Sequence, residues 1–211
     1  MFTPSQLSEK AKEFSSGLGV KDRFLMVFRP HICPFHVLME HVPDGSSVLD
    51  IGCGMGGWLY FLSRFGKISR GVGVEVSAER IENANSMKTD DDPLEFAALE
   101  VDQDWPGGSY DCLTMIDVLH HVPPAKQKEF MQRIEKLDVK KVIFKDIDPK
   151  AKFKSFMNSV HDVVLSKQLP RYCEKDKVAG WLEEMGYKIT YSGRCDMLWY
   201  SHYLITAERK I

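Results

Sequence analysis

The feature that most constrains the fold of this chain is an apolar run that leads through an acid into a cluster of glycines. It covers residues 48–57, which read Val-Leu-Asp-Ile-Gly-Cys-Gly-Met-Gly-Gly, and a helical apolar pattern follows at 58–62. Glycine lets the backbone turn sharply and lets a ligand come close to it. A helix that begins at such a turn presents free N–H groups and the positive end of its dipole there. The stretch therefore predicts a strand, a tight turn and a helix, with a ligand site at the turn.

The acid in this stretch, Asp50, says more about the ligand than the glycines do. Gly52, Gly54 and Gly57 also have the spacing of a dinucleotide-binding turn, so the glycines alone do not select a ligand. A carboxylate just before the first glycine repels a pyrophosphate and favours a cationic group. Asp50 therefore favours S-adenosylmethionine, which carries an ammonium and a sulfonium.

These residues resemble the first motif of the class I S-adenosylmethionine-dependent methyltransferases, in which three alternating glycines follow an acid. Asp50, Gly52, Gly54 and Gly56 match the motif. The resemblance extends over residues 48–148 and continues more weakly to the C-terminus. It implies S-adenosyl-L-methionine as the cofactor, and we expect Cys53 to contact the cofactor together with the motif residues.

Short apolar segments alternate with helical patterns after this motif. Such alternation predicts a three-layer, doubly wound α/β fold whose mostly parallel sheet is covered on both faces. Ligands bind such sheets at the carboxyl ends of the strands. The resemblance implies seven strands, of which the last runs antiparallel. Strands are expected at 47–51, 71–76, 94–99, 111–116, 141–145, 188–192 and 200–208, and helices at 58–65, 78–86, 125–137, 152–169 and 176–185.

The length and composition predict a single domain. A chain of 211 residues that is 44% hydrophobic and 27% charged can bury a substantial core. We expect one methyltransferase domain over 1–211, whose N-terminal cap contains one helix before residue 19 and another over 24–41. Its parts are a helical cap at 1–43, a cofactor-binding core at 44–148, an inserted helical lid at 149–175, and a C-terminal helix with a strand pair at 176–211.

Acids also follow the second and third predicted strands. Glu75 ends the second strand, where a carboxylate can accept hydrogen bonds from both ribose hydroxyls, and Val76 comes directly after it. The resemblance implies another acid near the adenine amino group. Glu100 is the better-placed match and Asp102 the alternative, with Val101 between them.

The fourth predicted strand leads into a second motif that resembles this family, Asp117-Val118-Leu119-His120-His121. We expect Asp117 and Val118 to lie beside the methionine part of the cofactor. Adjacent histidines rarely converge on one ion, so no metal site is predicted. His121 is the candidate for removing a proton from the methyl acceptor. His120 is either an ordered histidine near the substrate or a surface residue at the start of a helix.

The candidate substrate residues lie after the fifth strand. Asp146 and Asp148 are two positions apart there, so their side chains point the same way if the strand continues. His161 and Tyr172 could form a wall of the acceptor site. A solvated strand end is the alternative interpretation of the two acids. In the N-terminal cap, Arg29 is a candidate partner for the methionine carboxylate, with a surface salt bridge as the alternative.

The sequence also narrows the acceptor. Enzymes that methylate amines of nucleic acid bases typically carry Asn/Asp-Pro-Pro-aromatic after the fourth strand, and this chain does not. With a net charge of −2, this argues against DNA and, less strongly, against RNA. An oxygen of a small metabolite or of a lipid or glycan precursor is the favoured acceptor. The basic, amphipathic pattern at 152–169 allows peripheral membrane contact, although no run is long enough to cross a bilayer.

Cysteine usage and the N-terminus indicate a cytoplasmic protein. The five cysteines are odd in number and have no Cys-x-x-Cys spacing, so neither a disulfide framework nor a zinc site is predicted. No signal peptide is evident. Two alternative functions stay open. One is a nicotinamide-dependent oxidoreductase, against which Asp50 and the lack of a Tyr-x-x-x-Lys pair argue, and the other is a non-catalytic S-adenosylmethionine-binding module.

Overall fold

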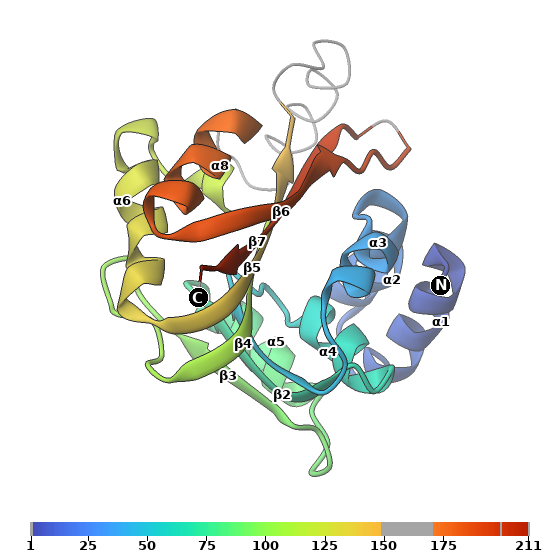
Figure 1. Cartoon of the computed structure of the whole chain (residues 1–211). Coiled ribbons are helices and arrows are strands. Elements are labelled where there is room, and N and C mark those ends of the chain that lie inside the picture. Colours follow the sequence, from blue (N-terminus) through green and yellow to red (C-terminus); the bar gives the residue numbers. More distant parts are fainter. Residues whose placement is uncertain (1, 149–170, 199, 211) are drawn as a thin grey trace.

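The strands in the described part of the chain form one seven-stranded sheet (Figure 1). The computed structural model describes residues 2–148, 171–198 and 200–210. The strand order is β3-β2-β1-β4-β5-β7-β6, with β7 antiparallel to both of its neighbours. The expected doubly wound fold with an antiparallel C-terminal strand is therefore confirmed. The strands are β1 Ser46–Ile51, β2 Ile68–Glu75, β3 Leu94–Ala98, β4 Ser109–Ile116, β5 Asp138–Ile147, β6 Tyr187–Arg194 and β7 His202–Arg209.

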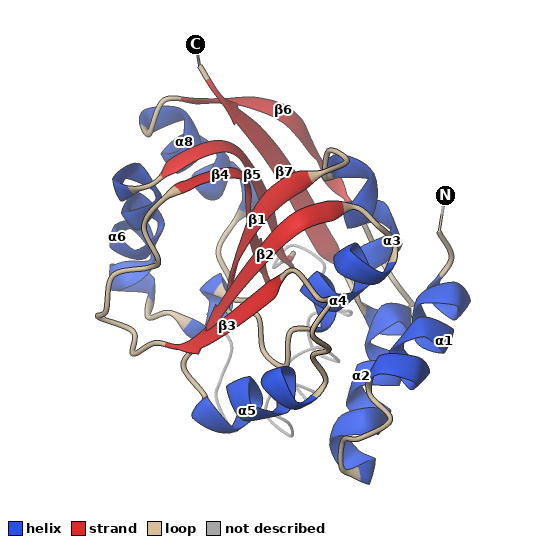
Figure 2. Cartoon of the chain, turned by 90° about the horizontal axis from the view of Figure 1, so that it is seen from below, coloured by secondary structure: helices blue, strands red, loops and turns tan. Residues whose placement is uncertain are grey.

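Helices cover both faces of the sheet, as Figure 2 shows. Helices α1 to α4 lie over one face, and α6 and α8 lie over the other. The helices are α1 Pro4–Phe14, α2 Val20–Ile32, α3 Phe35–Leu38, α4 Gly57–Arg64, α5 Ala78–Ser86, α6 Gln127–Gln132 and α8 Lys175–Glu184. Short 3-10 helices are η1 Met39–His41, η2 Leu119–His121, η3 Pro124–Lys126 and η4 Arg133–Lys136.

The N-terminal cap consists of several short helices, so the single helix expected over 24–41 is wrong. Pro30 lies in the last turn of α2, and Cys33 has an extended backbone before Pro34. Proline lacks an N–H group and disfavours helical backbone in the residue before it, which ends the helix. The expected helix at 125–137 is also divided, into η3, α6 and η4.

The C-terminal strand begins two residues later than predicted. Tyr200 pairs with Met197 across the turn between β6 and β7, and β7 starts at His202. The expected helix at 152–169 lies outside the described residues. Among the described residues, no helix combines the length and apolar character that crossing a bilayer requires.

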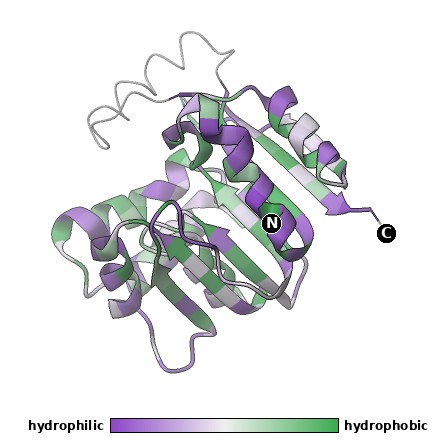
Figure 3. Cartoon of the chain, turned by 90° about the vertical axis from the view of Figure 1, so that its left-hand side faces the viewer, coloured by the Kyte–Doolittle hydropathy of each residue, from purple (hydrophilic) through white to green (hydrophobic). Residues whose placement is uncertain are grey.

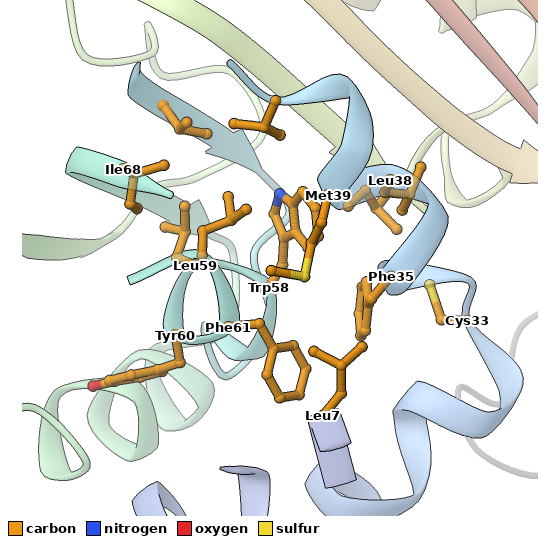
Figure 4. Packing of buried hydrophobic residues seen from close by; sticks show 14 of the residues in the cluster. Leu7, Cys33, Phe35, Leu38, Met39, Trp58, Leu59, Tyr60, Phe61 and Ile68 are labelled. Atoms are coloured by element: carbon orange, nitrogen blue, oxygen red, sulfur yellow. The ribbon is translucent and has the colours of Figure 1, made fainter. Parts of the chain in front are cut away.

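Two apolar cores, one on each face of the sheet, stabilise this arrangement. Neighbouring residues of one strand alternate between them, so Val48 packs into the core under α1 to α4 and Leu49 into the core under α6 and α8. Figure 4 shows the first core, in which the Trp58 ring packs against Phe35 with their centroids 5.5 Å apart. Figure 3 shows hydrophobic residues along the strands between the helical layers. The sheet thus holds the carboxyl ends of β2, β1, β4 and β5 together at one edge.

Candidate functional site

The loop between β1 and α4 turns through backbone conformations that favour glycine. Gly52, Gly54 and Gly56 have φ values of 72°, 57° and 76°. A Cβ on Gly52 would lie 2.5 Å from the Val118 side chain, and one on Gly56 would lie 2.6 Å from the Phe96 ring. A Cβ on Gly54 would meet nothing within 4 Å. The protein thus packs closely against both ends of the loop and leaves the backbone at its centre open to a ligand.

The carboxylate of Glu75 joins this loop to the turn between β2 and α5. It accepts hydrogen bonds from the backbone N–H groups of Gly54 at 3.1 Å, Val76 at 2.9 Å and Ser77 at 3.2 Å. Arg80 lies 3.9 Å away. A carboxylate has about four lone-pair sites, so an additional donor can still bind here. These contacts hold Glu75 at the strand end where the sequence predicts a ribose-binding acid.

Two exposed valines follow the ends of β2 and β3. Val76 is 54% exposed and Val101 is 63% exposed, although both side chains are apolar. The Leu99 N–H group donates to the Glu75 carbonyl at 3.0 Å, which brings the two turns together. The valines therefore offer apolar surface for a planar ring. Glu100 and Asp102 are both exposed in the same turn, so both stay candidates for the adenine amino group.

Asp50 is buried beneath the glycine loop. Its side chain accepts a hydrogen bond from the Thr114 hydroxyl of β4 at 2.6 Å, and only 2% of the residue is exposed. Burial raises the pKa of Asp50 to about 7, while Thr114 and Arg29 oppose this shift. A cation bound nearby would favour the charged carboxylate. Cys53, also buried, directs its thiol toward the carbonyl of Gly54.

Asp117 lies at the end of β4 in the left-handed region, with φ 58°, which is uncommon for a residue other than glycine. Its carboxylate accepts from the Arg29 guanidinium at 3.0 Å and from the Lys145 ammonium at 2.5 Å. Lys145 is completely buried, and Asp117 side-chain exposure is 18%. Burial would raise the pKa of Asp117, but Lys145 and Arg29 together hold it below its usual range. Arg29 thus contacts Asp117, which places it at this edge of the sheet.

The two histidines of the second motif have different surroundings. The His120 ring is buried and its Nδ1 lies 2.5 Å from a carboxylate oxygen of Asp146. Asp146 also accepts from the backbone N–H groups of His120 and Ile147, so it faces the protein interior. His121 is exposed, yet desolvation first and the adjacent His120 second lower its pKa to about 4. The structure therefore places an ordered His–Asp pair next to the predicted proton acceptor.

The remaining candidate substrate residues are spread more widely. Asp148 follows the last residue of β5 and donates its N–H group to the Ser201 carbonyl at 2.9 Å. The Tyr172 ring lies 6.2 Å from the His120 ring. Gln127 links this region by donating to the carbonyls of Leu119 and Arg171 at 3.1 Å and 2.8 Å. His161 lies outside the described residues, as does most of the expected lid.

The sequence analysis did not single out Lys145 or His202. Lys145 directly follows the apolar residues Val142, Ile143 and Phe144 of β5, and this unusual place for a lysine was the available signal. His202 begins β7 and is 3% exposed, and its buried Nδ1 has no hydrogen-bond partner among the residues that the structure describes. Nothing local in the sequence indicates that this nitrogen is buried at the same edge.

The residues at this edge fit S-adenosylmethionine. The open backbone at Gly54 leaves room for a ligand to approach the loop. The Glu75 carboxylate can bind the ribose hydroxyls, and the apolar surfaces of Val76 and Val101 can contact the planar adenine ring. Asp50 and Asp117 supply carboxylates close to the same loop. In the part of the chain that the structure describes, no group of His, Cys, Asp or Glu is arranged to hold a metal ion.

Solved structures share this fold at low sequence identity. Magnesium protoporphyrin IX methyltransferase from Synechocystis PCC 6803 with bound S-adenosylhomocysteine has a TM-score of 0.66 and 19% identity, over 84% of this chain and 80% of that chain. A methyltransferase solved with its activator from Haloferax volcanii has a TM-score of 0.69 and 17% identity, over 95% and 94%. An S-adenosylmethionine-dependent methyltransferase from Mesorhizobium loti has a TM-score of 0.65 and 14% identity, over 83% and 96%.

No curated protein sequence matches the chain. The methyltransferase-domain family, however, matches residues 30–192, which is more than half of the chain. This match favours methyl transfer over the nicotinamide-dependent alternative. The glycine loop, the strand-end acids and the family match lead to one conclusion: this chain belongs to the methyltransferase-domain family and is an S-adenosylmethionine-dependent methyltransferase.

Proposed function

We propose that the enzyme methylates an oxygen of a small metabolite or of a lipid or glycan precursor. The observation that supports this is the loop after β4, where Asp117-Val118-Leu119-His120 stands in place of the motif of amine-methylating nucleic acid enzymes. The net charge of −2 offers no general attraction to nucleic acid. A small acceptor that binds beside the cofactor is the substrate class these features favour.

Each part of the cofactor has candidate partners in the chain. Glu75 would bind the ribose hydroxyls, and Val76 and Val101 would flank the adenine, with Glu100 or Asp102 at its amino group. The glycine loop with Asp50, Cys53, Asp117 and Val118 would hold the methionine part. When bound, S-adenosylmethionine supplies a methyl group on a positively charged sulfur, which an acceptor lone pair can attack.

Alignment is the main contribution we expect from the chain. Holding an acceptor atom in line with the methyl group can lower the barrier by about 7–11 kcal/mol. A general base adds about 10²–10⁴-fold, and only where the acceptor must lose a proton. His121 remains the predicted proton acceptor, and a pKa of about 4 makes it a weak one. Asp146 holds the His120 ring in one orientation beside it.

The acceptor atom can be identified with carbon-13-methyl S-adenosylmethionine and a metabolite extract from cells that lack the enzyme. We expect labelled products whose carbon shift is that of a methyl group on oxygen. Glu75→Gln should lower the yield about tenfold at limiting cofactor, because a charge-assisted contact is lost. Glu79→Gln, on the exposed face of α5, should match the wild type.

Labelled methyl groups on nitrogen would contradict the oxygen acceptor. Equal yields from Glu75→Gln and Glu79→Gln would contradict the ribose-binding role of Glu75 while leaving the acceptor assignment intact. A chain that binds S-adenosylhomocysteine and labels nothing in the extract would instead support a non-catalytic module.

A further inference from the structure

One arginine joins the turn after β3 to the helical layer that contains α6. Arg133 is the first residue of η4 and directly follows α6. Its Nη1 group donates to the Val101 carbonyl at 2.8 Å, and its Nη2 group donates to the Gln103 carbonyl. Arg133 and Val101 are 32 positions apart, so this is a tertiary contact. One guanidinium therefore holds two carbonyls of the same turn.

Two aromatic rings orient the guanidinium that makes these bonds. It lies 4.3 Å from the centroid of the Trp105 ring and 5.5 Å from that of the Phe130 ring. The two rings meet edge to face at 5.3 Å, and Trp105 is buried in the core under α6 and α8. A planar guanidinium can stack on an aromatic face while its N–H groups form hydrogen bonds in its own plane. The core of the protein therefore fixes the direction in which Arg133 donates.

Further hydrogen bonds shape the turn and attach its other end to β2. The Gln103 N–H group donates to the Glu100 carbonyl at 3.1 Å, and the Gln103 side chain accepts from the Glu100 N–H group at 2.8 Å. The Leu99 N–H group donates to the carbonyl of Glu75, the residue proposed to bind the ribose. The turn is thus attached to β2 on one side and to Arg133 on the other. Its position relative to Glu75 depends on both attachments.

The residues that this turn exposes are the ones proposed to contact adenine. Val101 is 63% exposed although it is apolar, while its carbonyl is bound by Arg133. Glu100 and Asp102, the candidate partners of the adenine amino group, are exposed on either side of it. A hydrogen bond weakens steeply when its angle departs from the optimum. A shift of the turn would therefore weaken contacts to the base and leave those to the ribose and the methionine part in place.

The shape of the arginine, more than its charge, suits it to this role. Both of its Nη groups bond neutral carbonyls, whereas the nearby carboxylate of Asp104 binds Lys136 at 2.7 Å. A guanidinium presents several donors in a rigid fork, while a lysine ammonium is a point charge on a flexible stem. Lysine in place of Arg133 would keep the charge but would not span the two carbonyls in the same way.

We propose that Arg133 is a positioning residue that gives the enzyme its selectivity for adenine. By holding the turn, it places the Val101 side chain against the ring and the neighbouring acid at the amino group. Arg133 acts through the turn and not by contact with the cofactor. This inference rests on the cofactor contacts proposed above for the turn, and it does not depend on the identity of the methyl acceptor.

Comparison of two ligands tests this role on the full-length protein. In S-inosylhomocysteine an oxygen replaces the amino group of the base of S-adenosylhomocysteine, so the ratio of their dissociation constants measures base selectivity. We expect the wild type to bind S-adenosylhomocysteine about tenfold more tightly, because the other ligand lacks a charge-assisted hydrogen bond. Arg133→Gln should reduce this ratio to about twofold, and Arg133→Lys should also reduce it. Calorimetric titration gives each constant.

Arg209→Gln is the matched control. Arg209 also donates to two carbonyls, those of Val139 at 3.0 Å and Leu137 at 2.9 Å, and it lies 5.3 Å from the centroid of the Tyr187 ring. These contacts lie at the amino end of β5, opposite the cofactor edge of the sheet. Arg209→Gln should lower the urea midpoint about as much as Arg133→Gln does, and it should leave the ligand ratio unchanged.

An unchanged ratio in Arg133→Gln, with a lowered urea midpoint, would reduce the arginine to a structural role and overturn the proposal. An equal loss of selectivity in Arg209→Gln would also overturn it, because a general loss of stability would then explain the effect. If Arg133→Gln does not fold, full selectivity in Arg133→Lys would have the same consequence.

The wild type separates this inference from the proposed function. If it bound both ligands equally, the turn would not recognise the amino group and the role of Arg133 would be refuted, while methyl transfer to oxygen would stand. Labelled methyl groups on nitrogen would instead refute the oxygen acceptor and leave the selectivity for adenine intact.

Discussion

Asp50 shows how one residue can be suited to a cation and yet remain partly uncharged without it. The sequence places this acid just before the glycine loop, and the structure buries it against Thr114. Burial raises its pKa to about 7. The electrostatic preference for a cationic ligand is therefore strongest when the ligand is present, because the ligand favours the ionised form.

This coupling predicts that cofactor-product affinity depends on pH. If the charged carboxylate binds the ligand ammonium, affinity for S-adenosylhomocysteine should rise about tenfold from pH 6 to pH 8, since the pKa is about 7. Calorimetric titration measures this directly. The Asp50→Asn variant should bind S-adenosylhomocysteine weakly at both pH values and show no pH dependence. The Asp91→Asn variant, which changes an exposed acid elsewhere, should keep the pH dependence of the wild type. A slope that persists in Asp50→Asn would assign the titration to another group.

The raised pKa of Asp50 also makes the stability of the unliganded protein depend on pH, and this stability falls as the pH rises. The folded-state pKa of Asp50 lies above its value of about 4 in the unfolded chain. Its contribution to the stability of the unliganded protein is therefore complete below that lower value and is lost as the pH rises through about 7. Ligand binding and unliganded stability thus favour different protonation states of one carboxyl group.

At the scale of elements, the loop between β1 and α4 is defined by its neighbours as much as by its own sequence. Gly52 is packed against Val118 after β4, and Gly56 against Phe96 of β3. Met26 of α2 would lie 2.7 Å from a Cβ on Gly57, so the N-terminal cap closes on the start of α4. Three separate elements therefore fix the conformation of this loop.

Substitution of Gly56 should reveal this constraint. Gly56→Ala places a Cβ 2.6 Å from the Phe96 ring at φ 76°. Backbone strain and overpacking together should lower the free energy of unfolding by about 3 kcal/mol. Gly107→Ala, where a Cβ meets nothing within 4 Å, should change it by about 0.5 kcal/mol or less. Urea unfolding curves compare the two variants, and similar midpoints would show that the loop relaxes at little cost.

At the scale of the whole molecule, a single sheet couples two cores. Val48 and Leu49 are adjacent in β1 but pack on opposite faces. Trp58 belongs to the core under α1 to α4, and Trp181 of α8 packs against the other core. Neither core can lose its sheet residues without disturbing the other, so we expect the domain to unfold as one unit.

Fluorine labelling of the tryptophans tests this cooperativity without any substitution. The resonances of Trp58 and Trp181 in 5-fluorotryptophan-labelled protein should disappear at the same urea concentration, because both cores depend on one sheet. Two separate midpoints would show that the predicted single domain consists of two independently unfolding units.

Local features of the fold and of the cofactor site could be predicted from the sequence. The strand, turn and helix around the glycines depend on steric freedom at single residues and on apolar periodicity over short windows. The order of Asp50, Glu75 and Asp117 at successive strand ends follows from the same alternation. Pro34, which follows the extended residue Cys33, is the local signal in the sequence for the break in the cap.

Contacts between distant segments were decided only by the tertiary structure. Arg29 and Asp117 are 88 positions apart, and Lys145 reaches the same carboxylate only because β5 pairs with β4. The burial of His202 and the pairing of His120 with Asp146 likewise depend on strand order and register. Residue type determined what each strand end can bind, whereas long-range packing determined which of these groups share a site and which keep their charge.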